Sequence, residues 1–600
     1  MSFRRSILAL SFLPLFVFVL DLILRFNYLR LLELPLFQHF LYSFIFEWTI
    51  CFTAVWIVSQ FHHRRKTVTA IAVAILTVIQ LIAYGHYFYF GVLPNPYSVN
   101  YLLDHTADAL SLIGSSVTWI QGAVFAFLFL LQYVIFTKAL RGMDQLSSRF
   151  RFSIIGIFFL LIIVFNNNVR FAPASYSITP ATVFSIKYAL QERWFGSSFE
   201  VRHGYVRRRF TIEERPQMKA QYNCILILSE SVRSRSLSSY GYRRPTTPFQ
   251  DSMIAAGSII KFDHHFTNTV STQYTIPVLL SGVFTIRKTD QPFIYDYLKH
   301  WSDVKTYFFS SQSMQRSNID LVYNTSLDTF LCQEKLTLPQ FNDLGVDDEE
   351  FAGMVRSFHE KQSGEKFFSI IQFNNTHFPY TVKPSAEYFT STPDSAVVDL
   401  YDNTIREQDG LLRSYINSFR RAGLLDSTVI IFTSDHGEAF GERGHLGHLN
   451  TLYTEDVEVP LWIYLPPGFP KEKRDALRQN SKAVTSHLDL FPTMMDLFGL
   501  NKKNDPGMKF CGVSLFQSVG RNRIIPIVGK DMIDTKAVVI DSIKYIETVK
   551  DGIAKYEAYD FRTDAGERNN IWQRLTAAEQ KSIKQYILEV DTISMQSTQH

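Results

Sequence analysis

The sequence is poor in cysteine and nearly balanced in charge. Its 600 residues include only four cysteines, Cys51, Cys224, Cys332 and Cys511. Four are too few for a disulfide framework, although a Cys332–Cys511 pair remains open. The formal net charge is +4, which by itself does not argue for a nucleic-acid partner. The chain also lacks internal repeats and low-complexity tracts, and its length favours at least two domains.

Long apolar runs are abundant in the first 170 residues. They lie near residues 6–24, 39–60, 68–90, 119–137 and 152–168, and each is about long enough to cross a hydrocarbon core. No small-residue cleavage site follows the first run, so it is not interpreted as a cleaved signal peptide. Five such runs in series are difficult to bury within a soluble helical bundle. We therefore predict an α-helical transmembrane domain of five spans over residues 1–168.

Basic residues in the short loops predict the orientation of these spans. The basic side chains cluster before span one, between spans two and three, and between spans four and five: Arg4, Arg5, Arg64, Arg65, Lys66, Lys138, Arg141, Arg149 and Arg151. All three clusters fall on one side of the membrane if the N-terminus is cytoplasmic. Five spans then deliver residues 169–600 to the opposite face. In a bacterium this places them on the periplasmic or outer face of the inner (cytoplasmic) membrane.

Two spans carry acidic residues. Glu47 lies within span two, toward its outer half. An ionisable residue at such a depth is a functional candidate, and contact with a lipid amine, snorkelling and pairing with a neighbouring span all remain open. Asp21 precedes Arg25 by four residues near the end of span one, which predicts a helix-end ion pair.

The remaining chain divides into a linker and a soluble domain. Residues 169–220 are predicted to be a linker with an interfacial helix over about 180–194, and residues 221–600 a soluble catalytic domain. Short apolar, strand-like runs alternate there with helical patterns: 224–229, 306–310, 367–373, 429–433 and 459–465. This alternation predicts an α/β sheet with helices on both faces. Ligands gather beyond the carboxyl ends of strands in such sheets, where Glu230, His377, Asp435 and His436 lie.

The stretch TVIIFTSDHGEAFGERGHLGH, residues 428–448, is the strongest candidate for chemistry. Asp435 and His436 emerge side by side where a buried strand ends, and Glu438, His445 and His448 follow in a glycine-rich loop. Carboxylate oxygen and imidazole nitrogen are the ligands that zinc or manganese takes in proteins. The alternative is an exposed polar loop after a core strand.

This stretch resembles the metal-binding signature of the alkaline phosphatase/sulfatase superfamily. The resemblance is closest to the membrane-anchored phosphoethanolamine transferases and lipoteichoic acid synthases, and it covers roughly residues 221–570. It implies a sulfatase-like α/β fold for the soluble domain. It further implies that Glu230, Thr272, Asp435 and His436 bind Zn²⁺, with Mn²⁺ as an alternative.

The segment STQYTIPVLLSG, residues 271–282, bears on the nucleophile. Sulfatases have Cys-x-Pro-x-Arg at the corresponding place, and that cysteine becomes formylglycine. Here the cysteine position is Thr272, and the proline and arginine are missing from their places. Transferase members instead use a threonine followed five residues later by proline, which matches Thr272 and Pro277. The resemblance therefore implies a Thr272 nucleophile, activated by a metal. Thr275 is the second choice, and a structural helix-start threonine is the alternative.

Further roles are implied by the same resemblance. His377, in a Thr-His segment after a strand, would approach the phosphate or a second metal. His448 stands twelve residues after His436, the spacing of the second active-site histidine in the transferases, while His445 remains an alternative. Asn100 would contact the lipid donor from the loop between spans three and four, or that loop is only an interfacial anchor. His487 is a weaker candidate.

The chain also departs from the phosphoethanolamine transferases. Those enzymes usually carry several disulfide cysteines and lack the ending KYEAYDFRTDAGERNN, residues 555–570, which is similar to the sulfatase C-terminal segment. The expected reaction is transfer of a phospholipid head group, most simply phosphoethanolamine, to lipid A or an envelope glycan through a phosphothreonine. Phosphoglycerol transfer and sulfatase-like phosphodiester hydrolysis remain alternatives. No nucleic-acid partner is expected.

Overall fold

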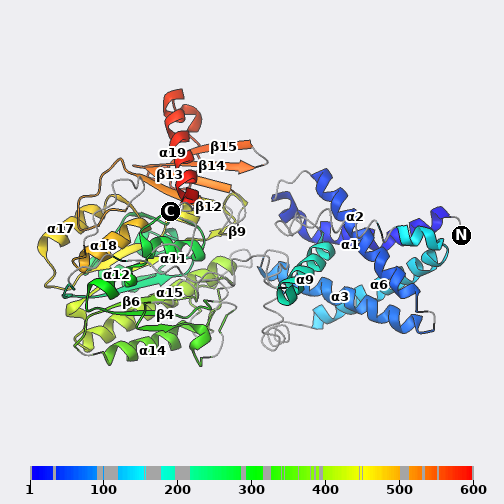
Figure 1. Cartoon of the computed structure of the whole chain (residues 1–600), viewed down its shortest axis with the longest axis horizontal. Coiled ribbons are helices and arrows are strands. Elements are labelled where there is room, and N and C mark those ends of the chain that lie inside the picture. The colour runs from blue at the N-terminus through cyan, green and yellow to red at the C-terminus, as the bar shows by residue number, and fades with distance from the viewer. Residues whose placement is uncertain are drawn as a thin grey trace. The chain divides into compact units, whose positions relative to one another are not determined.

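The protein forms two compact units, Met1–Arg202 and His203–His600, in a computed structural model (Figure 1). The structure describes residues 3–31, 36–61, 63–90, 99, 119–153, 156, 177–195, 212, 217–284, 292–314, 326–338, 341–342, 345–362, 364–378, 380–383, 387–390, 396–444, 446–448, 451–500, 512–529, 534–550 and 553–596. Asn100, His445 and Cys511 lie outside these ranges. The roles expected of Asn100 and His445 remain predictions. Cys332 is a buried free thiol, which does not support the Cys332–Cys511 pair that the sequence leaves open.

The described part of the first unit is helical. Its helices are α1 (Phe3–Leu31), α2 (Leu36–Ser59), α3 (Arg65–Phe90), α6 (Trp119–Asp144) and α9 (Ile178–Phe195). Within the described residues, three segments are long and apolar enough to cross a membrane: Arg5–Arg25, Arg65–Gly85 and Gly122–Asp144. A shorter apolar segment, Ser43–Ser59, lies in α2. The count of five spans remains a prediction, because most of residues 152–168 lies outside the described ranges.

Helix α9 packs into the first unit by its N-terminal turns. Ile178, Ala181 and Phe184 are buried in an apolar cluster with residues of α1, α2 and α3. The Ser177 hydroxyl, just before α9, donates a 2.9 Å hydrogen bond to Glu47 Oε2. Glu47 is thus wholly buried against protein, which favours pairing with a neighbouring segment over contact with a lipid amine.

The acid and base of α1 also pair. Arg25 Nη2 lies 2.6 Å from Asp21 Oδ2, and both side chains are buried. The expected pair therefore forms, although it lies inside α1, which continues to Leu31, rather than at a helix end.

The second unit is built on a seven-stranded sheet of order β2-β10-β7-β1-β6-β4-β5. Its strands are β1 (Asn223–Ser229), β2 (Ile259–Lys261), β4 (Lys305–Ser310), β5 (Thr329–Leu331), β6 (Phe367–Gln372), β7 (Thr428–Ser434) and β10 (Leu461–Tyr464). The five strands from β7 to β5 run parallel, and β10 is antiparallel to β7 and β2. All seven residues of β1 and of β7 are buried, as central parallel strands require.

Helices cover both faces of this sheet. One face packs on α11 (Thr272–Ser281), α12 (Ile294–Trp301) and α18 (Leu490–Leu497). The other packs on α10 (Pro248–Ala255), α14 (Asp348–Glu360) and α15 (Ala396–Arg421). Alternate residues of β1 enter the two cores: Leu226 joins the first, and Ile225 and Ile227 join the second. This is the two-sided α/β sheet that the sequence predicts.

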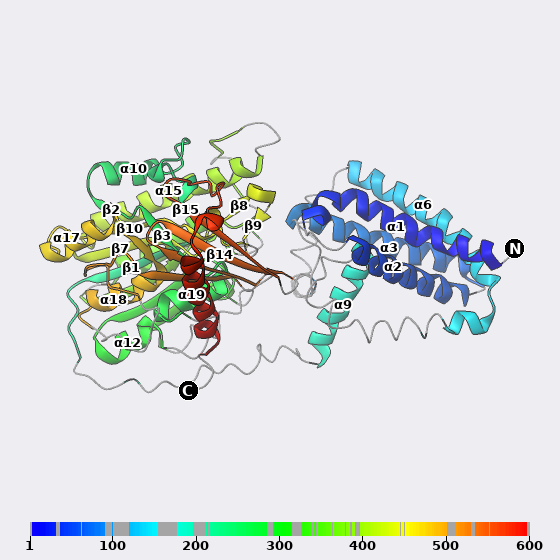
Figure 2. The ribbon, with the colours of Figure 1, turned by 90° about the horizontal axis from the view of Figure 1, so that it is seen from above.

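Smaller elements complete the second unit. Antiparallel strands β12 (Ile524–Gly529), β13 (Asp534–Ile540), β14 (Ile543–Lys550) and β15 (Ile553–Asp560) form a second sheet, which packs on α19 (Ala577–Gln596) (Figure 2). Strands β8 (Ala439–Phe440) and β9 (Leu446–Gly447) form a short hairpin. Strands β3 (His264–Phe266) and β11 (Val484–Ser486) pair in parallel, and α17 (Lys471–Asn480) and α16 (Thr454–Val457) lie in connecting segments.

Candidate active site

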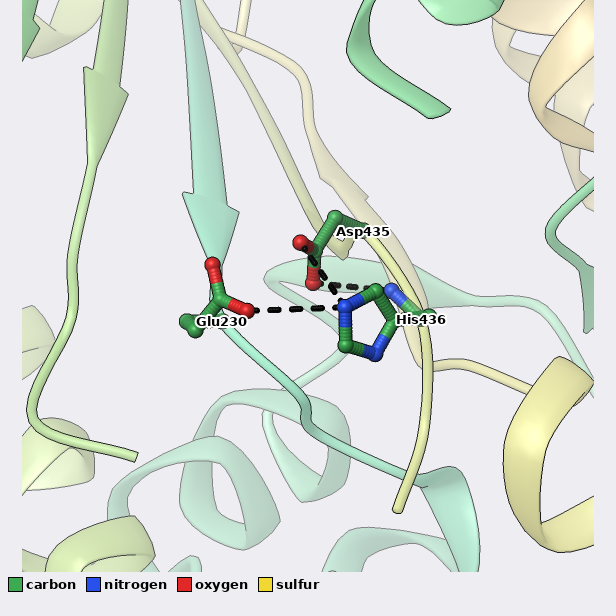
Figure 3. Close-up of side chains that lie close together, drawn as sticks. All are labelled: Glu230, Asp435 and His436. Atoms are coloured by element: carbon green, nitrogen blue, oxygen red, sulfur yellow. Dashed lines mark hydrogen bonds and ion pairs between the residues drawn. The ribbon is translucent and has the colours of Figure 1, made fainter. Parts of the chain in front are cut away.

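The candidate site lies where two neighbouring parallel strands end. Ser229 of β1 is in register with Ser434 of β7, so the next residues, Glu230 and Asp435, emerge side by side. His436 follows Asp435, and the three side chains point toward one another (Figure 3). Parallel pairing thus brings together residues that are about 200 positions apart in the sequence.

The Thr272 hydroxyl lies among the same three side chains. Its Oγ1 is 2.6 Å from Asp435 Oδ2 and 3.2 and 3.4 Å from the two carboxylate oxygens of Glu230. It is also 3.3 Å from His436 Nε2. Thr272 is the first residue of α11, so the start of this helix places the hydroxyl at the ends of β1 and β7. The structure therefore brings together the four residues that the sequence proposes as metal ligands.

The imidazole of His436 presents a ring nitrogen to the same cluster. His436 Nδ1 donates to the Gly437 carbonyl at 2.9 Å, which leaves a lone pair on Nε2. That nitrogen lies 3.5 Å from Glu230 Oε1 and 3.4 Å from Asp435 Oδ2. Ligand atoms of Glu230, Asp435 and His436 lie within 4.8 Å of one another, all buried. Two carboxylates, an imidazole lone pair and a hydroxyl are a donor set that fits zinc or manganese.

The two carboxylates differ in their environment. Burial, followed by the neighbouring charge of Asp435, raises the pKa of Glu230 to about 7. Burial also opposes ionisation of Asp435, but the nearby His436 and hydrogen bonds outweigh it and lower the pKa of Asp435. Those bonds come from Thr272 and from the amides of Ser231 and His436. A bound cation would favour ionisation of both groups.

Residues that the sequence did not suggest support Glu230. Gln312 Nε2 donates to Glu230 Oε2 at 2.5 Å, and Gln372 Nε2 donates to Gln312 Oε1 at 2.8 Å. Thr376 Oγ1 donates to the Glu230 carbonyl at 2.5 Å. Gln312 follows β4, in a segment from which no residue was expected in the site. The only sequence signal is its position at the carboxyl end of another parallel strand.

Asp348, at the start of α14, holds these supporting loops together. Its carboxylate accepts hydrogen bonds from the Ser311 hydroxyl at 2.6 Å and from the amides of Asn374 and Asn375 at 2.8–3.1 Å. Burial raises the pKa of this carboxyl to about 7. Asp348 thereby joins the segment before Gln312 to the segment before His377, a role that no sequence pattern indicates.

His448 lies beside the metal-ligand candidates. Its ring centroid is 3.9 Å from that of His436, and its Nδ1 is 3.2 Å from Glu438 Oε1. Glu438 Oε2 also accepts a 3.0 Å hydrogen bond from the Tyr380 hydroxyl. Although burial opposes ionisation of Glu438, the adjacent His448 lowers its pKa. A carboxylate on Nδ1 fixes the orientation of the His448 ring.

The other candidate histidines have different surroundings. His377 directly follows Thr376, whose hydroxyl donates to the Glu230 carbonyl, and its own Nδ1 donates to the Phe378 carbonyl at 2.6 Å. His487 is wholly buried beneath the site, with Nε2 3.4 Å from Thr433 Oγ1. Thr275 Oγ1 bonds to Thr269 rather than to the acidic cluster, so Thr272 is the hydroxyl at the candidate ligands.

The second unit is similar to known proteins. Residues 222–500 match the Sulfatase family model. Phosphoethanolamine transferase EptA of Helicobacter pylori is 24% identical over 297 residues, covering 47% of this chain and 54% of that protein. Lipoteichoic acid synthase-like YvgJ of Bacillus subtilis is 25% identical over 307 residues, covering 47% and 48%. The chain thus spans about half the length of the curated relatives it matches.

A solved structure shows the same fold. An alkaline phosphatase superfamily protein from Vibrio parahaemolyticus superposes with a TM-score of 0.50 at 16% identity. The match covers 68% of this chain and 98% of that protein. At this identity the likeness supports the fold alone.

Proposed function

We propose, from the premise that residues 222–500 form a domain of the sulfatase family, that this protein is a membrane-anchored phosphotransferase. It transfers a phospholipid head group, most simply phosphoethanolamine from phosphatidylethanolamine, to lipid A or an envelope glycan. The observation that carries the proposal is the hydroxyl of Thr272, which lies 2.6–3.4 Å from Asp435, Glu230 and His436. A hydroxyl among metal-ligand side chains suits covalent transfer.

Glu230, Asp435, His436 and Thr272 Oγ1 would hold zinc, with manganese as the alternative. When bound, the metal would lower the pKa of the Thr272 hydroxyl and polarise the donor phosphate. Gln312 orients Glu230 through the 2.5 Å bond from its amide, and the Ser231 amide orients Asp435 at 3.0 Å. Such bonds to ligating carboxylates fix their direction and affect metal affinity.

Thr272 carries the head group between donor and acceptor. Its Oγ1 forms a bond to the donor phosphorus, the bond from phosphorus to the diacylglycerol oxygen breaks, and the Thr272 proton is released. An acceptor hydroxyl then attacks the phosphothreonine, loses its own proton and frees Thr272. Two successive displacements at one site give ping-pong kinetics.

His448 and His377 move protons and contact phosphate in this scheme. The Glu438 carboxylate holds Nδ1 of His448 at 3.2 Å, so Nε2 is available to protonate the departing diacylglycerol oxygen. Nδ1 of His377 lies 2.6 Å from the Phe378 carbonyl, and we assign to His377 the contact with a phosphate oxygen. In the second step, Nε2 of His448 accepts the proton of the acceptor hydroxyl.

The helical unit suits a lipid donor. Three segments of membrane-spanning length would keep the domain at the bilayer, where both phosphatidylethanolamine and diacylglycerol reside. We place the catalytic domain on the periplasmic face of a bacterial inner membrane and assign contact with the donor to Asn100.

Replacement of Thr272 tests the mechanism. Thr272→Ala removes the attacking oxygen, and we expect transfer to fall by a factor on the order of a thousand or more. The other ligands remain, so the protein should still bind zinc, measured by elemental analysis. Thr272→Ser keeps the hydroxyl and should retain partial activity. Wild-type protein incubated with phosphatidylethanolamine and no acceptor should gain one phosphoethanolamine on the peptide that contains Thr272.

The mass of the adduct separates the alternatives. A phosphoglycerol adduct from phosphatidylglycerol would assign the second head group. Full activity of Thr272→Ala without any adduct would contradict covalent transfer and indicate direct attack by water, as in a phosphodiester hydrolase.

A further inference from the structure

The C-terminal sheet, which lies beyond residues 222–500, reaches into the active-site loops through a buried ion pair. Lys544 Nζ, on β14, lies 2.9 Å from Glu567 Oε1, and both side chains are wholly buried. Glu567 Oε2 accepts the backbone amide of Thr454 at 2.8 Å, and Lys544 Nζ donates to the Thr454 hydroxyl at 3.3 Å. Glu567 and Lys544 thus bond the backbone amide and the side-chain hydroxyl of Thr454, the first residue of α16.

A second connection runs through Arg443, at the tip of the β8–β9 hairpin. Its Nη1 donates to the Gly566 carbonyl at 2.9 Å, and its Nη2 pairs with Glu455. The guanidinium also lies 3.9 Å from the centroid of the Tyr453 ring, a cation–π contact. Arg443 therefore joins the hairpin tip to the turn after β15 and to α16 at once.

Backbone strain occurs on both sides of this contact. Arg443 has φ 53° and Glu567 has φ 49°, and neither is glycine. A left-handed conformation costs a non-glycine residue on the order of 1 kcal/mol and persists only where surrounding contacts enforce it. Arg443 makes the connection through its own side chain. Glu567 makes it through its side chain and through the carbonyl of its neighbour Gly566.

The connection continues to the candidate ligands. The Glu455 carbonyl lies against Gly437, where an added Cβ would be only 2.0 Å from it. The Gly437 amide donates to the Asp456 carbonyl at 2.9 Å. Gly437 follows His436 directly, and the base of the hairpin carries Glu438 on one side and His448 on the other. The position of both histidines therefore depends on α16 and on the hairpin.

We propose that Arg443 and Glu567 are positioning residues, through which the turn after β15 holds the β8–β9 hairpin so that His448 stays against Glu438 and His436. The acid–base role of His448 in this inference rests on the proposed function. The hold itself is a property of the fold and can be measured without turnover. In this view the C-terminal sheet is part of the catalytic apparatus.

The first test measures hydrogen exchange of the full-length protein by mass spectrometry. Arg443→Ala should raise exchange in peptides covering residues 437–448 by about tenfold, because the hairpin tip loses its anchor. Arg562→Ala is the matched control: Arg562 lies in the same turn, but it pairs at 3.5 Å with Asp541, and both side chains are about half-exposed. Unchanged exchange in Arg443→Ala would overturn the proposal whatever the reaction.

The second test measures transfer from phosphatidylethanolamine in detergent micelles. Arg443→Ala should lower kcat by about tenfold while KM and zinc content stay near wild type. In a His448→Gln background the same change should have no further effect, because Arg443 acts through His448. Effects that multiply in the double variant would assign Arg443 to general stability and overturn the positioning role. If wild-type protein forms no Thr272 adduct, but Arg443→Ala still has no further effect in the His448→Gln background, only the proposed function is contradicted.

Glu567 needs a paired substitution. Glu567→Gln alone leaves Lys544 buried without its partner, which can prevent folding. Glu567→Gln with Lys544→Met removes both charges and keeps an acceptor for the Thr454 amide. We expect this double variant to fold and to keep hairpin exchange within about twofold of wild type, whereas Glu567→Ala with Lys544→Met should raise it about tenfold. Equal exchange in the two variants would contradict the role of Glu567.

Discussion

Two buried carboxylates face one another in the candidate site, and they accept different sets of hydrogen bonds. Asp435 accepts hydrogen bonds from two backbone amides and from the Thr272 hydroxyl, whereas the carboxylate of Glu230 accepts them from the Gln312 amide and the Ser231 hydroxyl. Ionisation of Asp435 is therefore favoured, and the proton of the pair resides on Glu230, whose pKa rises to about 7. A metal that takes Glu230 as a ligand must displace that proton.

Metal affinity should consequently depend on pH around neutrality. Below about pH 7 the metal-free protein holds a proton on Glu230, so zinc affinity should fall by about tenfold for each pH unit of acidification. Above pH 7 this proton is absent and its contribution should level off. Competition with a chromogenic chelator measures the affinity. Glu230→Gln binds zinc more weakly but should lose this part of the slope, and an unchanged slope in that variant would assign the proton elsewhere.

At the scale of elements, the active site is a set of strand ends closed by loops. The apolar runs 224–229, 367–373 and 429–433 predicted β6 and the central strands β1 and β7 because central parallel strands are buried on both faces. Predicting the strands also predicted that Glu230 and Asp435 would meet. The resemblance to the sulfatase superfamily added Thr272.

Other features of the site left no local pattern in the sequence. The bond from Gln312 to Glu230 spans 82 positions, and that from Arg443 to the Gly566 carbonyl spans 123. Such contacts depend on how separate elements pack, so neither composition nor periodicity reveals them. Asp348 likewise reads as an ordinary acidic residue in the first turn of a helix. Its bonds to Asn374 and Asn375 appear only in the folded chain.

Alanine substitutions at two glycines should change the free energy of unfolding in opposite directions. A Cβ at Gly437 would lie 2.0 Å from the Glu455 backbone carbonyl, so Gly437→Ala should lower the free energy of unfolding by about 1–3 kcal/mol and weaken zinc binding. Gly410 lies inside α15, where a Cβ meets nothing within 4 Å. Gly410→Ala should raise the same free energy by about 0.5–1 kcal/mol through helix propensity. Chemical denaturation measures both, and a neutral Gly437→Ala would show that α16 moves freely.

At the scale of the whole molecule, the parity of the membrane spans decides which face carries the catalytic unit. Three segments within the described residues meet the length and apolarity of a span, and α2 contains a shorter one. Four crossings would return the chain to the side of its N-terminus. A fifth, over residues 152–168, would deliver the second unit to the opposite face. The proposed acceptors belong to the cell envelope, so the proposed reaction requires an odd number of spans after a cytoplasmic N-terminus.

Reporter fusions to the full-length chain resolve this parity. The basic residues after α2 and around the end of α6 predict cytoplasmic signals for fusions after Lys66 and after Asp144. A fusion after His600 should report the outer face, using β-lactamase for export and green fluorescent protein for the cytoplasm. Arg65 and Asp144, 2.8 Å apart, tie α3 to the end of α6, so the two cytoplasmic fusions should agree. A cytoplasmic signal after His600 would mean an even number of spans, and it would exclude an envelope acceptor even if Thr272 carries the head group.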